Sequence, residues 1–435
     1  MTSAAVPAWL PHVRRGVALS LLAALNVLLL IVWQWKVLTQ LGPGRDMDAL
    51  VAGMVLPNFA TAVVGGSLVN VLLPMLSAAP MAERSRMRAE LSATLLALFA
   101  GVAAVLALLA PLWVPLIAPG LMGQDRGAVV HLARIQLVGL ALSGVLTVQS
   151  VARQAEGSFV RVEAAQVAAS LGGLAALVWA APRFGATGVA VSAVLRVVLQ
   201  LLLLLSTPRA SGRLVLASDT LRELWRRVRP LLGASLYYKS DVVLDRLLAS
   251  LAPVGALSLY HVALQIISSG QQVIQRGIVA PAIRDMSAAR ATHGDLALRI
   301  RLRRSLTVVM LLSGLATVVL VATGYPLLLG VFGRGAVRPE QVRMLWVLLL
   351  LLSGVWLGGV AGLLLSSSFY VLGDTFTPAR IGVIGFTLAI GLKLVAFRAF
   401  GLPGLAAAAS AYYLMNAGLI GVALGRRLRL ARVET

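Results

Sequence analysis

The chain has 435 residues, of which 59% are hydrophobic and 12% charged, and its mean hydropathy is +0.90. This composition leaves too little polar surface for a soluble protein, and the apolar runs recur so densely that no soluble catalytic domain fits between them. A net charge of +22 would suit a nucleic-acid-binding protein. The basic residues lie instead in alternate loops between the apolar runs, as in membrane proteins, so no nucleic-acid partner is expected.

About 12 apolar runs are long enough to cross the hydrocarbon core of a bilayer as helices. They are continuously apolar, whereas the strands of a membrane barrel would alternate over about ten residues. The predicted fold class is therefore all-α, a polytopic membrane protein. In chain order the predicted spans are 16–38, 49–76, 92–118, 130–153, 162–182, 184–206, 229–250, 254–282, 302–332, 342–369, 379–398 and 402–425.

A repeat divides the sequence into two halves. The segment Phe184-Gly185-Ala186-Thr187-Gly188 returns as Phe400-Gly401-Leu402-Pro403-Gly404, and the two copies are 216 positions apart (400 − 184 = 216). Because this offset is close to half of the chain, we predict two pseudo-symmetric six-helix lobes, with any ligand site where the copies face each other. The predicted boundaries are 1–206 for the N-terminal lobe, 207–228 for a polar cytoplasmic linker, and 229–435 for the C-terminal lobe.

The arginine-rich loops predict the orientation in the membrane. They lie around Arg84, Arg222 and Arg299 and at both ends of the chain, whereas the opposite loops hold few basic residues. Both termini are therefore expected on the cytoplasmic side of a bacterial inner membrane. The basic loop at about 284–301 is either a solvated loop or an amphipathic segment that contacts anionic membrane lipids.

The first span resembles the apolar region of a signal peptide because it follows a short basic tail. It is longer than such a region, and no small-residue cleavage site follows Val37. We expect this helix to be retained.

Basic side chains inside the predicted spans indicate an anionic substrate. The chain has only three lysines, Lys36, Lys239 and Lys393, and all lie within or at the edge of a span, while Arg196 lies in the middle of the sixth span. A charge at mid-membrane costs about 2.5–3.5 kcal/mol on insertion scales, so such residues usually face a bundle interior or a wet cavity. We assign Lys239, Arg196 and Lys393 to a substrate cavity. Snorkelling to the membrane interface is the alternative for Lys36 and Lys393.

The seventh span also carries acidic residues. Asp241 and Asp245 are four residues apart and share one helical face, beside Lys239 and Arg246 on an adjacent face. These carboxylates are candidates for coupling transport to H⁺ or Na⁺. Internal salt bridges with neighbouring spans are the alternative.

The eighth span carries a regular polar stripe. His261, Gln265, Ser268, Gln272 and Gln275 follow a 4-3-4-3 spacing that keeps one face polar over several turns. Amide side chains both donate and accept hydrogen bonds, which suits hydroxyl-rich sugars, so we assign His261, Gln265 and Gln272 to the cavity. Hydrogen bonding between helices is the alternative use of such a stripe.

Nothing in the sequence indicates an enzyme. The chain has no cysteine, which excludes disulfides and thiolate metal sites, and its four histidines are scattered. No metal site and no cofactor are predicted.

Three motifs resemble those of MurJ/MviN-like lipid II flippases and related polysaccharide (Wzx-type) flippases. They lie in the second helix, in the seventh helix from Asp245 to Ser250, and after the tenth span. The residues that carry the first and third motifs are Asp48, Pro57, Asn58, Asp374, Thr375, Thr377 and Pro378. The resemblance implies the multidrug/oligosaccharidyl-lipid/polysaccharide exporter superfamily, whose members have two six-helix lobes and translocate substrates by alternating access. It also implies that Asn58 lines the cavity.

The chain departs from this family at several basic positions that hold the pyrophosphate of lipid II. Trp33-Gln34 stands where the family has an Arg-Asp pair in the first helix, Val55 precedes Pro57-Asn58, and Leu264 replaces an arginine in the eighth helix. The family's two additional C-terminal helices are also not expected after the twelfth span. These departures favour a polysaccharide-type flippase of twelve helices.

The expected function is translocation of a polyprenyl-pyrophosphate-linked oligosaccharide, a precursor of cell-envelope polysaccharide or peptidoglycan, across the inner membrane. Lys239 and Arg196 would bind the pyrophosphate, since charge-assisted hydrogen bonds are roughly twice as strong as neutral ones. The expected partners are the lipid-linked oligosaccharide, anionic lipids, and polysaccharide polymerase or glycosyltransferase machinery. The alternative is a cation-coupled multidrug antiporter on the same fold, for which an acidic, aromatic-lined cavity would be expected.

Overall fold

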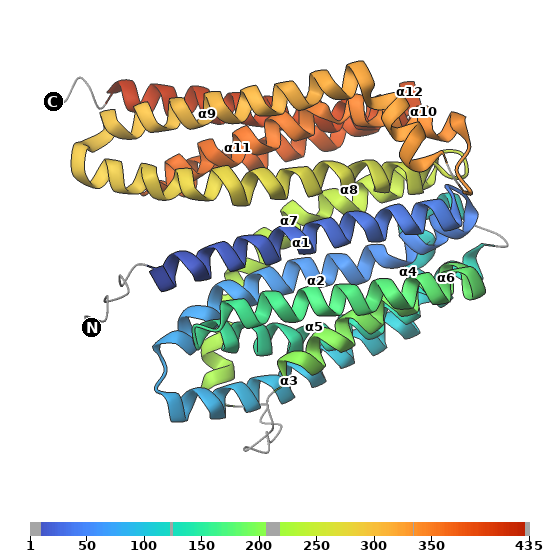
Figure 1. Cartoon of the computed structure of the whole chain (residues 1–435), viewed down its shortest axis with the longest axis horizontal. Helices are drawn as coiled ribbons and strands as arrows, with labels where there is room; N and C mark the ends of the chain where they lie inside the picture. Colours follow the sequence, from blue (N-terminus) through green and yellow to red (C-terminus); the bar gives the residue numbers. More distant parts are fainter. Residues whose placement is uncertain (1–9, 122–124, 206–217, 334, 431–435) are drawn as a thin grey trace, which may run out of the picture. The chain divides into compact units, whose positions relative to one another are not determined.

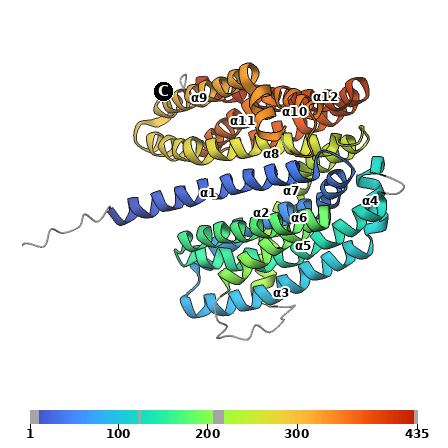
Figure 2. The same cartoon turned by 45° about the vertical axis from the view of Figure 1, so that its right-hand side comes forward.

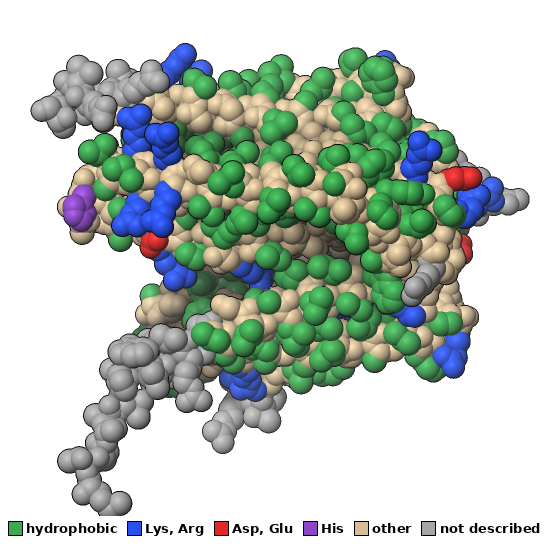
Figure 3. Space-filling view, turned by 45° about the horizontal axis from the view of Figure 1, so that its top comes forward, with side chains coloured by type: hydrophobic (Ala, Val, Ile, Leu, Met, Phe, Trp, Pro, Cys, Tyr) green, Lys and Arg blue, Asp and Glu red, His purple; other side chains and the backbone are tan. Residues whose placement is uncertain are grey.

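The computed structural model describes residues 10–121, 125–205, 218–333 and 335–430, and within these ranges every regular element is a helix. The predicted all-α class is confirmed. Large apolar side chains are exposed along most helices, including Leu21, Leu112 and Leu311 at 65%, 66% and 68%. In the space-filling view apolar side chains spread over this face, while lysine and arginine lie mostly toward its left and right sides (Figure 3). A bilayer is the solvent that this pattern suits.

The chain divides into two compact units, with the division between Leu247 and Leu248. Unit 1 also excludes the short turn 42–44, which belongs to unit 2. The proposed lobe boundaries stay a prediction, because residues 207–217 of the expected linker lie outside the described residues and the next helix begins at Asp219. The helices of unit 1 are α1 (Leu10–Leu41), α2 (Arg45–Ala78), α3 (Met81–Leu108), α4 (Ala110–Ile117), η1 (Pro119–Leu121), α5 (Arg126–Ala155), α6 (Phe159–Leu204) and most of α7 (Asp219–Ser250).

Unit 2 contains the remaining helices, and its core lies where α9, α11 and α12 pack together (Figures 1 and 2). Met286 of α9, Leu364 of α11 and Leu424 of α12 are buried in this core. The helices of unit 2 are α8 (Ala256–Ile274), the π-helix η2 (Gln275–Val279), α9 (Ala280–Phe332), α10 (Pro339–Leu351), α11 (Ser353–Val371) and α12 (Phe376–Leu430).

Eight stretches of the described residues are long and apolar enough to cross a membrane. Three of them contain a glycine with non-helical geometry, at Gly185, Gly294 and Gly401, so each comprises two helices. The helix α7 is not among the eight. The protein is thus a multi-pass membrane protein, and the number of twelve spans stays a prediction.

The structure repeats the same turn after the fourth predicted span of each half. Gly157 and Gly373 are 216 positions apart and have φ values of 76° and 78°. The N–H of the next residue, Ser158 or Asp374, donates to the carbonyl five residues earlier at 2.9 Å in both copies. In each copy an arginine donates to a carbonyl at this helix end, Arg84 to Ala155 and Arg290 to Val371, and the two acceptor residues are again 216 positions apart (371 − 155 = 216).

The repeated pentapeptide forms the same break in both halves. Gly185 has φ 55° and ψ −134°, and Gly401 has φ 62° and ψ −141°. Such backbone geometry is nearly restricted to glycine. Three residues later, Gly188 and Gly404 approach the backbone of the preceding helix so closely that an added Cβ would lie 2.4 and 2.0 Å from the carbonyl oxygens of Ala180 and Ala396. The segment therefore folds two spans against each other in each copy.

Candidate functional site

Arg196 of α6 is an intramembrane cation that makes no hydrogen bond or ion pair with another described residue. Its stem packs where α6 folds back beside α1. A Cβ added to Gly173 would lie 2.9 Å from the Cβ of Arg196 and 3.3 Å from the ring of Trp33. Intramembrane arginines are usually paired or face a polar pathway, so this guanidinium can bind an anion from outside the chain.

The polar cluster of α7 is only partly buried. Lys239 is exposed and makes no hydrogen bond or ion pair within the described part of the chain, whereas Asp241 is half-buried. Asp245 and Arg246 are buried, at 5% and 8% exposure, and each has an interaction partner. A second cation of unit 1 is thus accessible to an anion, while one of the two carboxylates is held inside the protein.

The motif residues of α2 have different environments. Asp48 is buried, Pro57 is buried, and Asn58 is exposed. The hydroxyl of Thr61 donates to the Pro57 carbonyl at 2.9 Å, which gives that carbonyl a second partner next to the proline. Proline cannot donate a helical hydrogen bond, so α2 is weakened at this turn, where the amide of Asn58 is exposed.

The polar stripe of α8 is buried at its first residue and more exposed further along the helix. His261 is 6% exposed, whereas Gln265 is exposed and Gln272 is half-buried. Ser268 donates to Gln265, with 3.2 Å between the hydroxyl and the side-chain oxygen. The amides from Gln265 onward are therefore accessible to a ligand, while His261 is buried and already has an interaction partner.

Two functional features of this region escaped sequence reasoning. Gln271, which is outside the predicted stripe, donates to the Val355 carbonyl at 2.9 Å and fixes α8 to α11. The stripe residue Gln275 and the following Arg276 are exposed and lie in the π-helix η2, which the sequence did not predict. A π-helix shifts the helical face by part of a turn and often marks a functional site. The glutamine-rich segment before Arg276 was the only sequence signal.

Lys393 of α12 has no exposed surface and has an interaction partner within the protein. Its side chain therefore does not snorkel to the membrane interface. Its place in a substrate cavity stays a prediction.

Asp374 and Thr375 directly precede α12, and Thr377 and Pro378 lie in its first turn. Asp374 accepts hydrogen bonds from the N–H groups of Phe376 and Thr377, at 3.1 and 2.9 Å, and from the Thr377 hydroxyl at 2.7 Å. Arg427, at the other end of α12, forms an ion pair with the same carboxylate. The hydrogen bonds from Thr377, followed by the charge of Arg427, lower the pKa of Asp374. This motif residue thus caps a helix.

The capping role predicts a stability that depends on pH. Because the pKa of Asp374 is lower in the folded protein, its contribution is complete above the unfolded pKa of about 3.9 and is lost as the pH falls through the folded value. We expect Asp374→Ala to lower Tm at neutral pH and to reduce the loss of Tm on acidification. Asp374→Asn should keep most of the neutral Tm, since asparagine caps about as well. Thermal unfolding in detergent from pH 7 to pH 3 measures both effects, and an unchanged acid response in Asp374→Ala would contradict the assignment.

Within the described ranges, no group of three or more histidines or carboxylates could hold a metal ion. The arrangement offers unpaired cations on α6 and α7 and exposed amides on α8. Groups of these kinds can hold an anion or a hydroxyl group through hydrogen bonds.

These features define a multi-pass helical membrane transport protein, and solved transporters share its fold. A lipid II flippase MurJ in an inward closed conformation aligns with TM-score 0.81 and 12% identity over 94% of this chain and 87% of that chain. An inward-facing multidrug resistance MATE-family transporter of the MOP superfamily aligns with TM-score 0.74 and 15% identity over 95% of both chains. No curated protein matches. The family model for the lipid II flippase MurJ matches residues 37–434, so the chain belongs to the MurJ lipid II flippase family.

A third transporter of the same superfamily shares the fold less closely. The MOP superfamily transporter from Pyrococcus furiosus, described as having a binding pocket of reverse polarity that suggests a different function, aligns with TM-score 0.57 and 13% identity over 95% of both chains. The match to the family model confirms the resemblance to the MurJ family that the sequence motifs indicated. Membership places the protein among transporters of lipid-linked substrates.

Proposed function

We propose that the protein translocates a polyprenyl-pyrophosphate-linked oligosaccharide across the bacterial inner membrane by alternating access, with both termini in the cytoplasm. The observation that carries this proposal is the unpaired guanidinium of Arg196 within α6. A pyrophosphate brings about two negative charges, and an arginine fork binds phosphate oxygens in a bidentate manner. Lys239 supplies the second cation.

The position of Arg196 supports a pyrophosphate in particular. Arg196 lies beside Trp33, which stands where the family resemblance predicts a basic residue of the first helix. The cation absent from α1 is therefore replaced by one from α6 at the same contact. An anionic substrate group can bind there although the first-helix arginine is missing.

The sugars of the substrate are assigned to the amide groups. Gln265 and Gln272 of α8 and Asn58 of α2 each offer donors and acceptors that match sugar hydroxyls. Lys393 and His261, which are both buried, are proposed as further members of the substrate cavity. Asp241 and Asp245 are the residues that would couple transport to H⁺ or Na⁺, because a carboxylate whose occupancy differs between two states shifts the equilibrium between them. Partners would be anionic lipids and the polymerase or glycosyltransferase machinery that makes or consumes the glycan.

Mass spectrometry of polyprenyl-linked glycans tests this proposal. Extracts of cells depleted of the protein should accumulate one lipid-linked species, and restoration of the wild-type chain should clear it. The mass of the accumulated species would identify the glycan. Depleted cells that show no such species, but become sensitive to cationic toxins, would instead identify the protein as a cation-coupled multidrug antiporter.

A further inference from the structure

Unit 2 contains a cavity of about 360 Å³ that no transport step described above uses. It lies where the start of α8, the start of α10 and the break in α12 meet, and it is lined by apolar side chains or glycine except at Arg338 and Gln341. Cavities from about 300 Å³ upward hold small ligands or parts of larger ones. The space is therefore sufficient for a segment of a hydrocarbon chain.

The two polar side chains of this cavity differ in what they can still bind. Gln341 accepts a hydrogen bond from the N–H of Arg338 at 3.0 Å and donates to the Pro43 carbonyl at 2.8 Å, so its amide is occupied. The guanidinium of Arg338 is exposed and makes no hydrogen bond or ion pair with another described residue. One free cation therefore stands at the edge of an apolar space.

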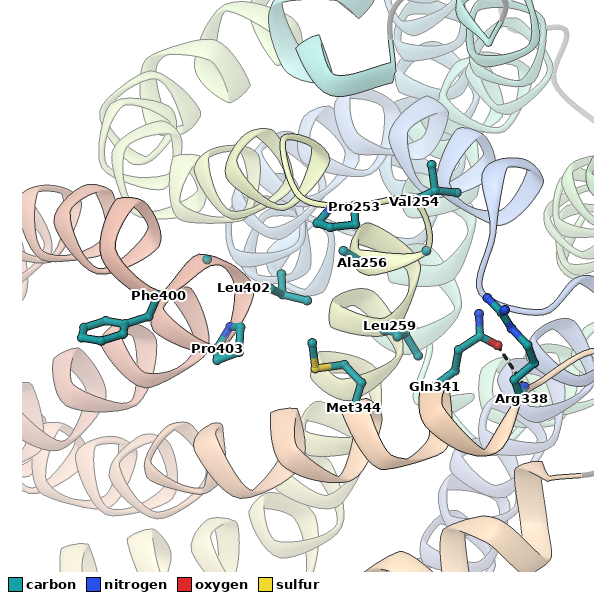
Figure 4. A pocket seen from close by; sticks show the side chains of 12 residues that line it. Pro253, Val254, Ala256, Leu259, Arg338, Gln341, Met344, Phe400, Leu402 and Pro403 are labelled. Carbon is teal, nitrogen blue, oxygen red and sulfur yellow. Dashed lines mark hydrogen bonds between the residues drawn. The ribbon is translucent and has the colours of Figure 1, made fainter.

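The charged and apolar parts of the lining are separated. Figure 4 shows Arg338 and Gln341 together at one end, with Leu259, Met344, Leu402 and Phe400 extending away from them. Phe400 is 74% exposed, so the apolar end is open to the surrounding solvent, which for this protein is lipid. A ligand that fits this arrangement has an anionic group and a flexible apolar chain.

The position of the cavity in the membrane further restricts the class of ligand. The cavity lies at the start of α8 and at the break in α12, away from the basic residues Arg284 of α9 and Arg426 near the end of α12. By the positive-inside rule these arginines face the cytoplasm, which puts the cavity at the outer interface of the membrane. There, Arg338 would meet the phosphates of outer-leaflet lipids and Phe400 would lie at the level where aromatic residues are enriched.

We propose that this cavity binds one anionic phospholipid of the outer leaflet, with its phosphate on Arg338 and one acyl chain in the apolar part. The bound lipid would fill the space between α8, α10 and the α12 break and so hold these three elements together. This site is separate from the transport residues.

Native mass spectrometry of the detergent-purified full chain tests the proposal, with phosphatidylglycerol and with phosphatidylcholine of the same acyl chains. We expect Arg338→Gln to weaken the tightest phosphatidylglycerol site about tenfold, the factor that 1.4 kcal/mol provides, and to leave phosphatidylcholine binding unchanged. Arg343, an exposed arginine one turn later on α10 and outside the cavity, provides the matched control, and Arg343→Gln should bind like the wild type.

A second variant tests the acyl chain separately from the charge. Met344→Trp fills the cavity from a half-buried position, so it should remove the tight site although Arg338 remains. Unchanged binding in both Arg338→Gln and Met344→Trp, or an equal loss in Arg343→Gln, would overturn the proposal. Loss of polyprenyl phosphate binding rather than phosphatidylglycerol binding in Arg338→Gln would overturn it too, because the site would then belong to the substrate lipid.

Discussion

Replacing Arg196 by alanine should reduce transport by at least about tenfold while the protein still inserts into the membrane. A hydrogen bond to a charged group contributes about 1.5–3 kcal/mol, and 1.4 kcal/mol is a factor of ten. The loss would be large because Arg196 is the intramembrane cation of α6 that no described residue neutralises. Arg196→Lys should retain part of the activity, since it keeps the charge but not the bidentate geometry.

Accumulation of the lipid-linked intermediate in cells that express each variant measures this loss. Arg183 provides a matched control on the same helix, because its side chain already donates to the Trp179 carbonyl at 2.7 Å and lies 4.8 Å from the Trp179 ring centroid. Arg183→Ala should transport normally. Normal transport by Arg196→Ala, at equal amounts of protein in the membrane, would remove the pyrophosphate site from the mechanism.

The architecture could be predicted from the sequence because each span is specified locally. A continuous apolar run must form a helix in lipid, and the boundaries predicted between the spans at 182–184 and 398–402 lie beside the breaks at Gly185 and Gly401. Helices that continue through a predicted loop were harder to predict from the sequence. The helices α8, η2 and α9 run together from 256 to 332 with one break at Gly294, because the polar residues between 284 and 301 are also good helix formers.

The candidate site could be predicted only in part, since exposure depends on contacts with other helices. The stripe of α8 has regular spacing, yet His261 is buried at one end and Gln271, outside the stripe, makes the contact with α11. Close to that contact α10 and α11 are interrupted at Leu352, where the N–H of Val355 donates to the hydroxyl of Ser410 of α12 at 3.2 Å. No periodicity within α8 reveals an interruption in another helix.

For Asp374 the sequence identified the motif but did not predict what the residue does in the structure. The family resemblance identified the segment from Asp374 to Pro378, whereas its structural function follows from local chemistry. An aspartate can cap a helix when a threonine follows three residues later. The aspartate carboxylate then accepts hydrogen bonds from both the N–H and the hydroxyl of the threonine. A motif shared within a family can therefore report a helix start and need not report a substrate contact.

The second large effect that we expect concerns the repeated break itself. Gly404→Ala should destabilise the protein, because the added Cβ would lie 2.0 Å from the Ala396 carbonyl oxygen and the backbone of one span would have to move. Overpacking of this kind costs about 1–3 kcal/mol or more. Gly188→Ala should have the same effect in the other copy, where the distance to the Ala180 oxygen would be 2.4 Å.

Gly391 gives a control in which the same substitution should act in the opposite direction. It lies in the first half of α12, is exposed, and would place a Cβ with nothing within 4 Å. Alanine is about 1 kcal/mol more favourable than glycine inside a helix, so Gly391→Ala should be neutral or stabilising. Thermal unfolding of the three variants in detergent measures the difference. Since Gly188 and Gly404 pack in the same manner, both of their alanine variants should be less stable than the wild type. A loss of stability in only one of these two variants would show that the break is required in one half of the protein alone.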